Sequence, residues 1–575
     1  MAITVTVCLL SGEAASVSLD PSRSVETLRA KASQALGRSV GKLVSSGGSF
    51  LRGRGSLADA GVQDGDTITV VTQKVALRAT ESAFAFIRAD GSVVTWGDQW
   101  EGGDCSDVQD QLHDVQSIQA TAAAFAALCA DGRVVSWGNP EFGGDSSTVQ
   151  WRLVDVSQIQ STSGAFAALR QDGTVETWGM PHLGGNCDLV YGKLQNVRQI
   201  QANDAAFAAL RADGSVVTWG ADEEGGNSQE VQQYLHGVRC IQRGFPGFTA
   251  IKEHGQVVSW GFIDPDVHLP GLDQAEGIYR TGLSDVKEMR MMGDTWAAVG
   301  SDERIKTWGY TGDRKKQHQL HAMRGVKRII HNESNAWAAI TNDGSVATWG
   351  EPCSGGDSRS VKRRLKKVEH IQASGSAFAA IRSDGGVVTW GVQDQGGNSQ
   401  AVRKCLKNVK EIQASCAAFA ALRADGTVVA WGKKNHGGDC SAVQEQLHDV
   451  TCIQASLGAF AAIRTDGSVV TWGPPSFGGN SSRVKEQLGR SQADDEAETR
   501  ARAKARELAR AKAKARAKAR ARARPAIAKA QAQRKAQAKA KAKAKAKPKA
   551  KAKAKAKAKA KAKAKAKVLK KPSQK

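Results

Sequence analysis

The sequence lacks the motifs that mark many enzyme active sites. It contains no phosphate-binding G-x-x-x-x-G-K-[ST] loop, no H-E-x-x-H zinc motif and no G-x-S-x-G nucleophile turn. Its ten cysteines are scattered and form no C-x-x-C pair, which argues against a disulfide framework and favours a reduced, intracellular protein. We therefore expect no catalytic residue, no metal ligand and no cofactor.

Long apolar runs are also absent. No segment approaches the roughly 20 apolar residues that a membrane-spanning helix needs. The opening MAITVTVCLLSG lacks a charged leader and alternates like a strand, so it does not predict a signal peptide. We expect an intracellular chain without a membrane span.

A net positive charge is lacking outside the C-terminal tail. Residues 500–575 hold 33 Lys and Arg and one acid, Glu507, a net charge of +32. Because the whole chain has a formal charge of +24, residues 1–499 sum to −8. The body is therefore mildly acidic, and the basicity belongs to a tail that recognises partners differently from a folded basic face.

The tail, residues 491–575, lacks aromatic residues and alternates Lys or Arg with Ala. A period of two gives no apolar helical stripe, so we predict a disordered polycation whose composition resembles linker-histone tails. Without groups that stack on bases, it should neutralise phosphates of DNA or RNA regardless of sequence. The alternative is a sticky or nuclear-targeting appendage. Representative contact residues are Arg502, Arg506, Arg516, Arg520, Lys541, Lys551 and Lys561.

Residues 1–72 predict a compact α+β domain. MAITVTV alternates as a strand does, SGE is a turn, and SVSLD begins a second strand. In the next segment Val25, Leu28 and Ala32 share one helical face, and Ser24 precedes them as an N-cap. Two further apolar segments, KLV and DTITVVT, complete the domain.

The order of these segments resembles ubiquitin over about 72 residues. The counterparts are M-x-I-x-V, D-P-S before the helix, K-L-V, S-G-G, G-x-x-L-A-D-x-x-V and T-I-T-V-V. Where ubiquitin ends in a free Gly-Gly, this chain continues as TQKVALRAT, so the resemblance implies an integral ubiquitin-like domain. It also implies a receptor-binding apolar patch at Leu9 or Leu10, Val44 and Val71. The alternative is that these are ordinary half-buried strand residues.

Trp-Gly pairs recur through the middle of the chain. Successive tryptophans are 41 residues apart, except for one gap of 48 between the fifth and sixth, and an aromatic residue stands twelve positions before each. A fixed period in this range indicates a solenoid or a propeller. The tryptophans are Trp96, Trp137, Trp178, Trp219, Trp260, Trp308, Trp349, Trp390, Trp431 and Trp472.

Each repeat contains a hairpin signal, such as FAALRADGSVVTW, in which Asp-Gly joins two β-prone runs. A third run such as DVQSIQAT brings the count to three strands. We predict a mainly β protein, with a β-propeller of ten blades of about 41 residues over residues 74–490. The alternative is two smaller rings divided near the fifth and sixth repeats. Because the tenth repeat lacks its third run, we expect Lys74–Thr80 to complete the last blade and close the ring.

The repeats resemble those of the regulator of chromosome condensation, which carry D-G-x-V-x-x-W-G and then a Gly-containing loop. They are compact, similar to those of a bacterial β-lactamase inhibitor protein. The family of the regulator of chromosome condensation includes a guanine-nucleotide exchange factor for a nuclear GTPase and large HECT ubiquitin ligases. We expect no ligase activity because no HECT domain follows residue 490. The loops on which exchange depends have no match here.

Four residues behind each Trp-Gly do not repeat, as in DQWE (98–101), NPEF (139–142), MPHL (180–183) and PPSF (474–477). Because each loop leads to Gly-Gly, the loops should lie along one rim of the propeller, where binding residues gather. We expect Trp100, Phe142, Leu183 and Phe477 to be exposed interface residues; the alternative is unconstrained drift. The candidate partner-binding residues are Trp100, Glu101, Phe142, His182, Leu183, Glu223, Gln395, Lys434, His436 and Phe477.

Two further features depart from a plain repeat. The fifth and sixth repeats lose Gly-Gly and gain residues around FIDPDVHLPGLDQAEGIYR. They are either a pair of repeats that have lost the common pattern or a specialised docking loop. The recurring GG[DN][SC] places Cys105, Cys187 and Cys440 in equivalent loops. Equivalent positions on separate blades stand apart, so we expect no shared metal site.

Together these features predict a monomeric, non-enzymatic adaptor, nuclear or nucleo-cytoplasmic. The propeller would bind a protein partner. The N-terminal domain would bind ubiquitin receptors or the proteasome, and the tail would bind nucleic acid. One alternative is a chromatin-associated guanine-nucleotide exchange factor for a small GTPase. Another is an accessory subunit or truncated relative of a propeller-containing ubiquitin ligase.

Overall fold

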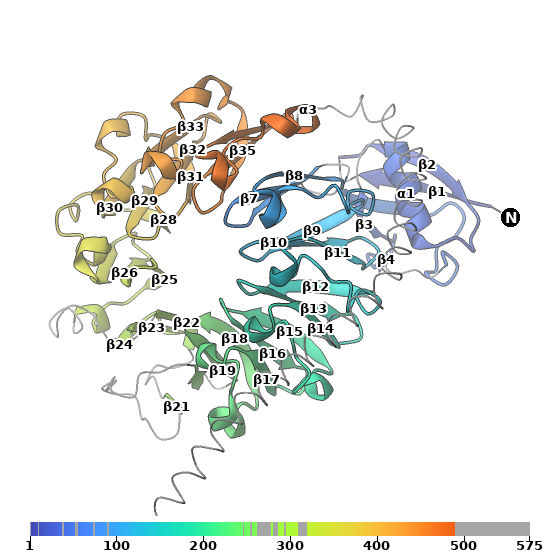
Figure 1. The fold of residues 1–575 in the computed structure, drawn as a ribbon, viewed down its shortest axis with the longest axis horizontal. Coiled ribbons are helices and arrows are strands. Elements are labelled where there is room, and N and C mark those ends of the chain that lie inside the picture. The colour runs from blue at the N-terminus through green and yellow to red at the C-terminus, as the bar shows by residue number, and fades with distance from the viewer. Residues whose placement is uncertain are drawn as a thin grey trace, which may run out of the picture. The chain divides into compact units, whose positions relative to one another are not determined.

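The structure is a computed structural model, and its described residues form a mainly β protein (Figure 1). No helix among them is long and apolar enough to cross a membrane. The described residues are 2–9, 11–36, 40–51, 56–72, 75–88, 91–244, 246–253, 256–261, 278–279, 286–292, 295–308 and 319–488.

The N-terminal strands form a mixed sheet of order β2-β1-β5-β3-β4, in which β1 and β5 run parallel. One helix packs against it, which is a β-grasp arrangement. Ser24 Oγ accepts the backbone N–H of Thr27 at 3.3 Å, so the predicted N-cap is confirmed. The elements are β1 (Ile3–Leu9), β2 (Ala14–Leu19), α1 (Val25–Leu36), β3 (Val40–Val44), β4 (Phe50–Leu51) and β5 (Thr67–Thr72).

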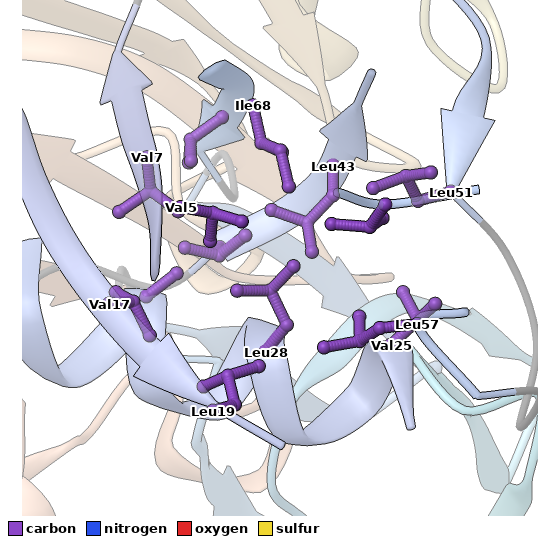
Figure 2. Packing of buried hydrophobic residues seen from close by; sticks show 14 of the residues in the cluster. Val5, Val7, Val17, Leu19, Val25, Leu28, Leu43, Leu51, Leu57 and Ile68 are labelled. Carbon is purple, nitrogen blue, oxygen red and sulfur yellow. The ribbon is translucent and has the colours of Figure 1, made fainter. Parts of the chain in front are cut away.

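Apolar side chains of this sheet and of α1 meet in one core (Figure 2). Val5 and Val7, two residues apart on β1, both point into it, as strand alternation requires. Val25 and Leu28, three residues apart on α1, complete it from the helix side. The periods seen in the sequence thus set the face that each element buries.

Ten further sheets follow, one for each repeat (Figure 1). In each blade the strands pair antiparallel in chain order, V-x-x-I-Q-A first, A-F-A-A-L-R second and V-V-T-W-G third. The fifth blade gains a short fourth strand, β21 (Ile278–Tyr279).

The first strands are β6 (Ala76–Ala79), β9 (Val115–Ala120), β12 (Val156–Ser161), β15 (Val197–Ala202), β18 (Val238–Gly244), β22 (Val286–Met292), β25 (Val326–His331), β28 (Val368–Ala373), β31 (Val409–Ala414) and β34 (Val450–Ala455). The second strands are β7 (Ala83–Ile87), β10 (Ala124–Cys129), β13 (Ala165–Arg170), β16 (Ala206–Arg211), β19 (Gly247–Lys252), β23 (Thr295–Gly300), β26 (Ala336–Thr341), β29 (Ala377–Arg382), β32 (Ala418–Arg423) and β35 (Phe460–Arg464).

The third strands are β8 (Val93–Gly97), β11 (Val134–Gly138), β14 (Val175–Gly179), β17 (Val216–Gly220), β20 (Val257–Trp260), β24 (Ile305–Trp308), β27 (Val346–Gly350), β30 (Val387–Gly391), β33 (Val428–Gly432) and β36 (Val469–Trp472). Short helical segments follow most of them: η1 (Gln99–Gly103), η2 (Pro140–Phe142), η3 (Pro181–Leu183), η4 (Tyr191–Lys193), η5 (Asp222–Glu224), η6 (Gln229–Tyr234), η8 (Pro352–Gly356), η9 (Gln393–Gln395), η10 (Gln400–Val402), η11 (Lys434–His436), η12 (Ser441–Gln446), η13 (Pro475–Phe477), η14 (Ser482–Val484) and α3 (Lys485–Leu488).

The strand that we expected to complete the last blade instead opens the first. β6 pairs with β7, Leu77 opposite Phe86, and every later V-x-x-I-Q-A strand likewise pairs with the strand that follows it. The predicted exchange of a strand across the ring is therefore wrong. The V-x-x-I-Q-A strand reaches its successor through a short turn, so its nearest pairing partner lies within its own blade.

The blades nevertheless form a closed cycle. In seven of the ten blades, one residue in the turn after the first strand donates its N–H to the carbonyl of the equivalent residue in the next blade, and Leu457 of the last blade donates to Glu81 of the first at 3.1 Å. Phe86 and Ile463 of the two end blades share a hydrophobic cluster. Further clusters and strand contacts carry the cycle through the fifth and sixth blades, so the alternative of two smaller rings is wrong. The other bonds join Glu81 to Ala122, Ala122 to Ser163, Ser163 to Asp204, Ser334 to Gly375, Gly375 to Cys416 and Cys416 to Leu457.

In eight of the ten blades the tryptophan of the repeated aromatic pair donates a hydrogen bond to the loop of the preceding blade, whereas within the described residues the Trp349 indole N–H of the seventh blade has no partner. In the third blade Phe166 lies opposite Trp178 with ring centroids 5.2 Å apart, and the Trp178 indole N–H donates to the Gly143 carbonyl of the preceding loop at 2.9 Å. Gly143 has φ 95°, and a Cβ there would lie 2.6 Å from Phe166, so the position requires glycine. The equivalent bond from Trp96 to Gly478 closes the cycle. Burying each aromatic ring stabilises the frame by about 2–3 kcal/mol.

In every described blade except the fifth, where β21 pairs with β20, the third strand is the outer edge, and the connection to the next blade covers it. In the first blade the Gln109 side-chain amide donates to the Val93 carbonyl at 3.1 Å, and Cys105 Sγ donates to Gln109 Oε1 at 3.1 Å. Gln150, Gln232 and Gln444 cap their own blades in the same way. A covered edge cannot pair with another sheet. We call these segments the outer connections, residues 104–114, 145–155, 186–196, 227–237, 357–367, 398–408 and 439–449.

Candidate functional site

The turn after each first strand and the variable loop after each third strand lie at the same end of the blade. The second strand runs back from that end, and the third strand returns to it after the Asp-Gly turn. We call this end the loop face. First strands of successive blades lie next to one another, so their turns form the inner part of the loop face and the variable loops surround them.

In the eight blades whose loops contain Gly-Gly, one buried polar side chain ties the loop to the turn. Thr80 Oγ1 accepts the Ala83 N–H at 2.9 Å and donates to the Glu101 carbonyl, the fourth position of the loop, at 3.2 Å. The loop backbone is therefore fixed whatever its side chains are. The equivalent side chains and carbonyls are Thr121 and Phe142, Thr162 and Leu183, Asn203 and Glu224, Asn332 and Ser354, Ser374 and Gln395, Ser415 and His436, and Ser456 and Phe477.

The loops show one pattern of exposure. In the eight loops with Gly-Gly, the second and third side chains are exposed, while the fourth is half-buried or buried. Among the predicted binding residues, this places Trp100, His182, Glu223 and Lys434 on the surface, with Trp100 78% exposed. The half-buried ones are Glu101, Phe142, Leu183, Gln395, His436 and Phe477.

Three of the four predicted exposed apolar residues are thus placed wrongly. Phe142 and Phe477 pack against hydrophobic clusters that their own blades form with the next blade of the cycle. A Cβ added to Gly458 would meet the Phe477 ring at 2.5 Å, and one added to Gly164 would meet Leu183 at 2.7 Å. A large fourth side chain here lies over a glycine in the turn of the same blade. These residues shape the inner loop face more than they project from it.

Neighbouring fourth positions also touch. The His436 ring lies 6.1 Å from the Phe477 ring, which joins the ninth blade to the tenth. Burial and then the Lys433 ammonium lower the pKa of His436, so this imidazole is neutral at pH 7. The pair forms an apolar arc on the inner loop face.

Two other fourth positions are acidic and crowded by like charge. Burial, with the nearby carboxylates of Asp98 and Glu81, raises the pKa of Glu101. Burial and then Asp204 raise the pKa of Glu224. Within the described residues, Oε2 of each glutamate has no hydrogen-bond partner. A cation placed beside either glutamate would offset both the burial of its carboxylate and the repulsion from the nearby carboxylates.

A cavity of about 300 Å³ lies between the turns of the last four blades, lined by residues that include His331, Glu333, Cys416 and Leu457. Burial, and then the charges of nearby arginines, lower the pKa of His331. The described residues contain no group of three His, Cys, Asp or Glu that could hold a metal ion. The cavity offers shape and polarity rather than a set of metal ligands.

Exposed aromatic residues also lie on the outer connections, outside the sites predicted from the sequence. Trp151 is 74% exposed, and the Arg152 guanidinium lies over the Trp151 and Tyr191 rings at 4.9 and 5.6 Å. Arg152 and Tyr191 hold the buried Glu176 carboxylate at 3.2 and 2.9 Å. Leu189 beside them is 99% exposed. The sequence feature that could have indicated this cluster is Glu176, an acid at a position where most third strands carry valine.

The predicted apolar patch of the N-terminal domain is only partly on the surface. Leu9 is 5% exposed and belongs to the core, so its assignment to the patch is wrong. Val44 is half-buried and Val71 is 36% exposed, and the register of β3 with β5 puts both on one face. Leu10 lies outside the described residues. So do the predicted nucleic-acid contacts Arg502, Arg506, Arg516, Arg520, Lys541, Lys551 and Lys561.

No family model and no curated protein matches this sequence. Similar solved structures include yeast RCC1 (Prp20) bound to Kap60, at 13% identity, 72% of this chain, 92% of that chain and a TM-score of 0.31. Prp20p from Saccharomyces cerevisiae, described with its binding to Gsp1p and histones, is 14% identical over 63% of this chain and 82% of that one, TM-score 0.28. The CRINKLY WD40 ectodomain of the Arabidopsis thaliana receptor kinase ACR4 is 13% identical over 48% and 95%, TM-score 0.28. At such low TM-scores these likenesses support no statement about partners or activity.

Proposed function

We propose that this chain is a non-enzymatic scaffold that binds a protein partner on the loop face. One observation carries the proposal: the same buried hydrogen bonds hold the loop backbones, while the second and third side chains are exposed and differ from blade to blade. A fixed backbone that presents varied side chains is how binding surfaces are built on rigid folds.

The chemistry of the loop face suggests the kind of partner. Trp100 offers a large exposed aromatic surface of the kind that dominates binding energy at protein interfaces. Glu101 and Glu224 favour lysine or arginine on the partner, because a cation would stabilise carboxylates that burial and like charge destabilise. The partner we propose therefore presents an apolar pocket and basic side chains.

The N-terminal domain is proposed to engage ubiquitin receptors or the proteasome through Val44 and Val71. Support comes from the mixed sheet order and from the position of both valines on the face opposite the core. Val71→Asp should abolish recovery of purified proteasome, whereas Ser16→Asp, an exposed position on β2, should leave it unchanged. Equal recovery of both variants would count against this part of the proposal.

The tail is proposed to tether the scaffold to nucleic acid in the nucleus. Its support is composition alone, an excess of 32 positive charges in 76 residues. Such a polycation binds phosphates without reading bases, and its affinity falls steeply with salt. Deleting residues 500–575 should remove most of the salt-dependent affinity and the nuclear retention of the chain.

The loop face is tested by proximity labelling with the full chain. A variant that truncates four exposed loop side chains should lose a defined set of protein neighbours, because it leaves the buried hydrogen bonds intact. A control variant truncates four exposed side chains on the Asp-Gly turns and outer connections and should keep that set. The loop variant is Trp100→Ala, His182→Ala, Glu223→Ala and Lys434→Ala. The control is Gln171→Ala, Lys193→Ala, Glu230→Ala and Glu445→Ala.

An unchanged set of neighbours in the loop variant would overturn the assignment of the partner to the loop face. An exchange factor, the other class of function, would accelerate nucleotide release from a small GTPase. The scaffold proposal predicts no acceleration across a panel of small GTPases.

A further inference from the structure

The seven described outer connections share one length of eleven residues but differ in charge. The segment after the seventh blade, 357–367, contains six basic residues and one acid, net +5. The segment after the eighth blade, 398–408, contains three basic residues and no acid, net +3. The other five carry between −4 and 0. Residues 1–499 have a negative net charge, but they contain two adjacent connections that are basic.

Most of these cations have no ionic partner. Arg359 pairs with Asp357 at 2.6 Å. The remaining eight form no ion pair within the described part of the chain, and all but the half-buried Arg364 are exposed. We call these eight the outer basic patch: Lys362, Arg363, Arg364, Lys366, Lys367, Arg403, Lys404 and Lys407.

The two connections meet at a cleft. Arg364 and Arg403 line the same cavity of about 380 Å³. Burial, and then the charges of Arg403 and Arg382, lower the pKa of Arg364, although its guanidinium stays protonated. Asp357 also lines this cavity but is paired with Arg359, and no ion pair to Arg364 or Arg403 is seen among the described residues. Cations held this close without an ion pair raise the energy of the protein, and a bound anion would lower that cost.

The patch also replaces a structural contact. Lys362 and Arg403 stand where Gln109, Gln150 and Gln444 cap the outer strands of other blades. No side-chain hydrogen bond from Lys362 or Arg403 to the outer strand is seen among the described residues. Two adjacent blades thus lack a hydrogen bond worth about 1 kcal/mol and present cations instead.

We propose that the outer basic patch binds the phosphate backbone of double-stranded nucleic acid. Guanidinium and ammonium groups are the usual partners of phosphate oxygens. None of the described large apolar side chains that are exposed lies in either connection, so neither base stacking on a single strand nor insertion into lipid is provided for. Phosphate contacts alone bind without regard to sequence. This site is distinct from the tail and does not depend on the loop-face partner.

The test uses a chain that ends at residue 499. Within the described residues, the hydrophobic clusters and the closing contacts of the cycle lie before residue 489, so this chain keeps those contacts. Binding to a fluorescent mixed-sequence 20-base-pair duplex is measured from 50 to 200 mM salt. Lys362→Glu/Lys404→Glu is compared with Lys193→Glu/Lys485→Glu, which changes the charge equally at exposed positions outside the patch and outside the loop face.

The chain ending at 499 should bind the duplex. The patch variant should lose at least tenfold in affinity at 50 mM salt, and its log–log salt slope should fall by about 1.8, because two phosphate contacts of ~0.9 each are lost. The control should lose less than threefold. The proposal is overturned by equal losses in the two variants, by a preference for oligo(dT), or by binding to phosphatidylserine vesicles but not to the duplex. If only the full chain binds the duplex, the tail proposal stands and the patch proposal fails.

Discussion

The loop face and the outer connections vary in different ways on one repeated frame. At the loop face, exposed positions change in kind from blade to blade, as from Trp100 to His182 to Glu223. The outer connections change as a block, positive on two adjacent blades and neutral or negative on the others that are described. A mosaic of shapes and charges suits a protein surface, whereas a block of one sign suits a polyanion.

In a repeat protein, exposed side chains that differ between repeats indicate function, whereas the residues shared by all repeats form the frame. Both surfaces depend on the same aromatic pairs, turn-to-turn hydrogen bonds and loop-fixing side chains. Changes to that frame should disable both surfaces together, and changes to exposed side chains should disable one at a time. The blades that lack a feature serve as controls for those that have it.

The largest expected effect comes from the frame. Trp178→Ala removes a buried ring that stacks on Phe166 and bonds to the preceding loop. We expect the free energy of unfolding to fall by about 3–5 kcal/mol, as for other buried aromatic truncations. Urea denaturation measures it. Trp100→Ala, at an exposed tryptophan, should change stability by no more than about 0.5 kcal/mol, and similar losses for both would contradict the two roles.

The next effect separates buried from exposed cysteines. Burial raises the pKa of Cys105 to about 11 and that of Cys129 to about 12. Because the thiolate is the nucleophile, both should react with iodoacetamide at pH 8 at least about 100-fold more slowly than the exposed thiols, and Cys129 more slowly than Cys105. The exposed thiols are Cys353 on the loop face and Cys405 on an outer connection. Peptide mass spectrometry gives the four rates, and rates of similar size would contradict the described packing.

A smaller effect tests the replaced glutamines. Lys362→Gln/Arg403→Gln should restore two caps, so stability should rise by about 0.5–1.5 kcal/mol per bond while duplex affinity falls. Urea denaturation and duplex titration measure the two quantities. The converse change Gln109→Lys should cost stability and give no affinity, because its connection carries −4. Affinity that survives the glutamine substitutions would mean that these two cations do not contact the ligand.

The smallest effect concerns the crowded glutamates of the loop face. Because their folded pKa values are raised, their stabilising contribution is complete below the unfolded pKa and is lost as pH rises through the folded pKa. Glu101→Gln/Glu224→Gln should therefore stabilise the protein at pH 7 by a few tenths of a kcal/mol, since solvent screens these half-buried groups. The gain should disappear near pH 4. A gain of equal size at both pH values would contradict the charge origin.

Much of the frame could be predicted from the sequence because its signals are local. The Asp-Gly hairpins, the Trp-Gly period and the helix after Ser24 each depend on residues within one repeat or one turn. The sequence does not predict in the same way whether the V-x-x-I-Q-A strand pairs with the hairpin before it or with the hairpin after it. A cyclic repeat has no marked start, and the missing strand at its end fits either assignment until the pairing of β6 with β7 is seen.

The surfaces were harder to predict because they depend on residues distant in sequence. Leu183 and Phe477 are half-buried because Gly164 and Gly458 leave room beneath them, nineteen residues earlier in each case. No local pattern reveals that space. The outer basic patch was hidden for a different reason, since summing charge over the whole body averages +5 and +3 with the acidic connections.

The most direct test of two separate surfaces uses the natural thiols of the chain ending at residue 499. Cys405 on the outer connection and half-buried Cys416 on the inner loop face are alkylated with iodoacetamide in the presence and absence of excess mixed-sequence duplex, with buried Cys105 as an internal reference. We predict that the duplex slows alkylation of Cys405 at least fivefold and leaves the rate at Cys416 unchanged. Equal protection of both thiols, or protection of Cys416 alone, would contradict the division between a loop face for protein and an outer patch for phosphate.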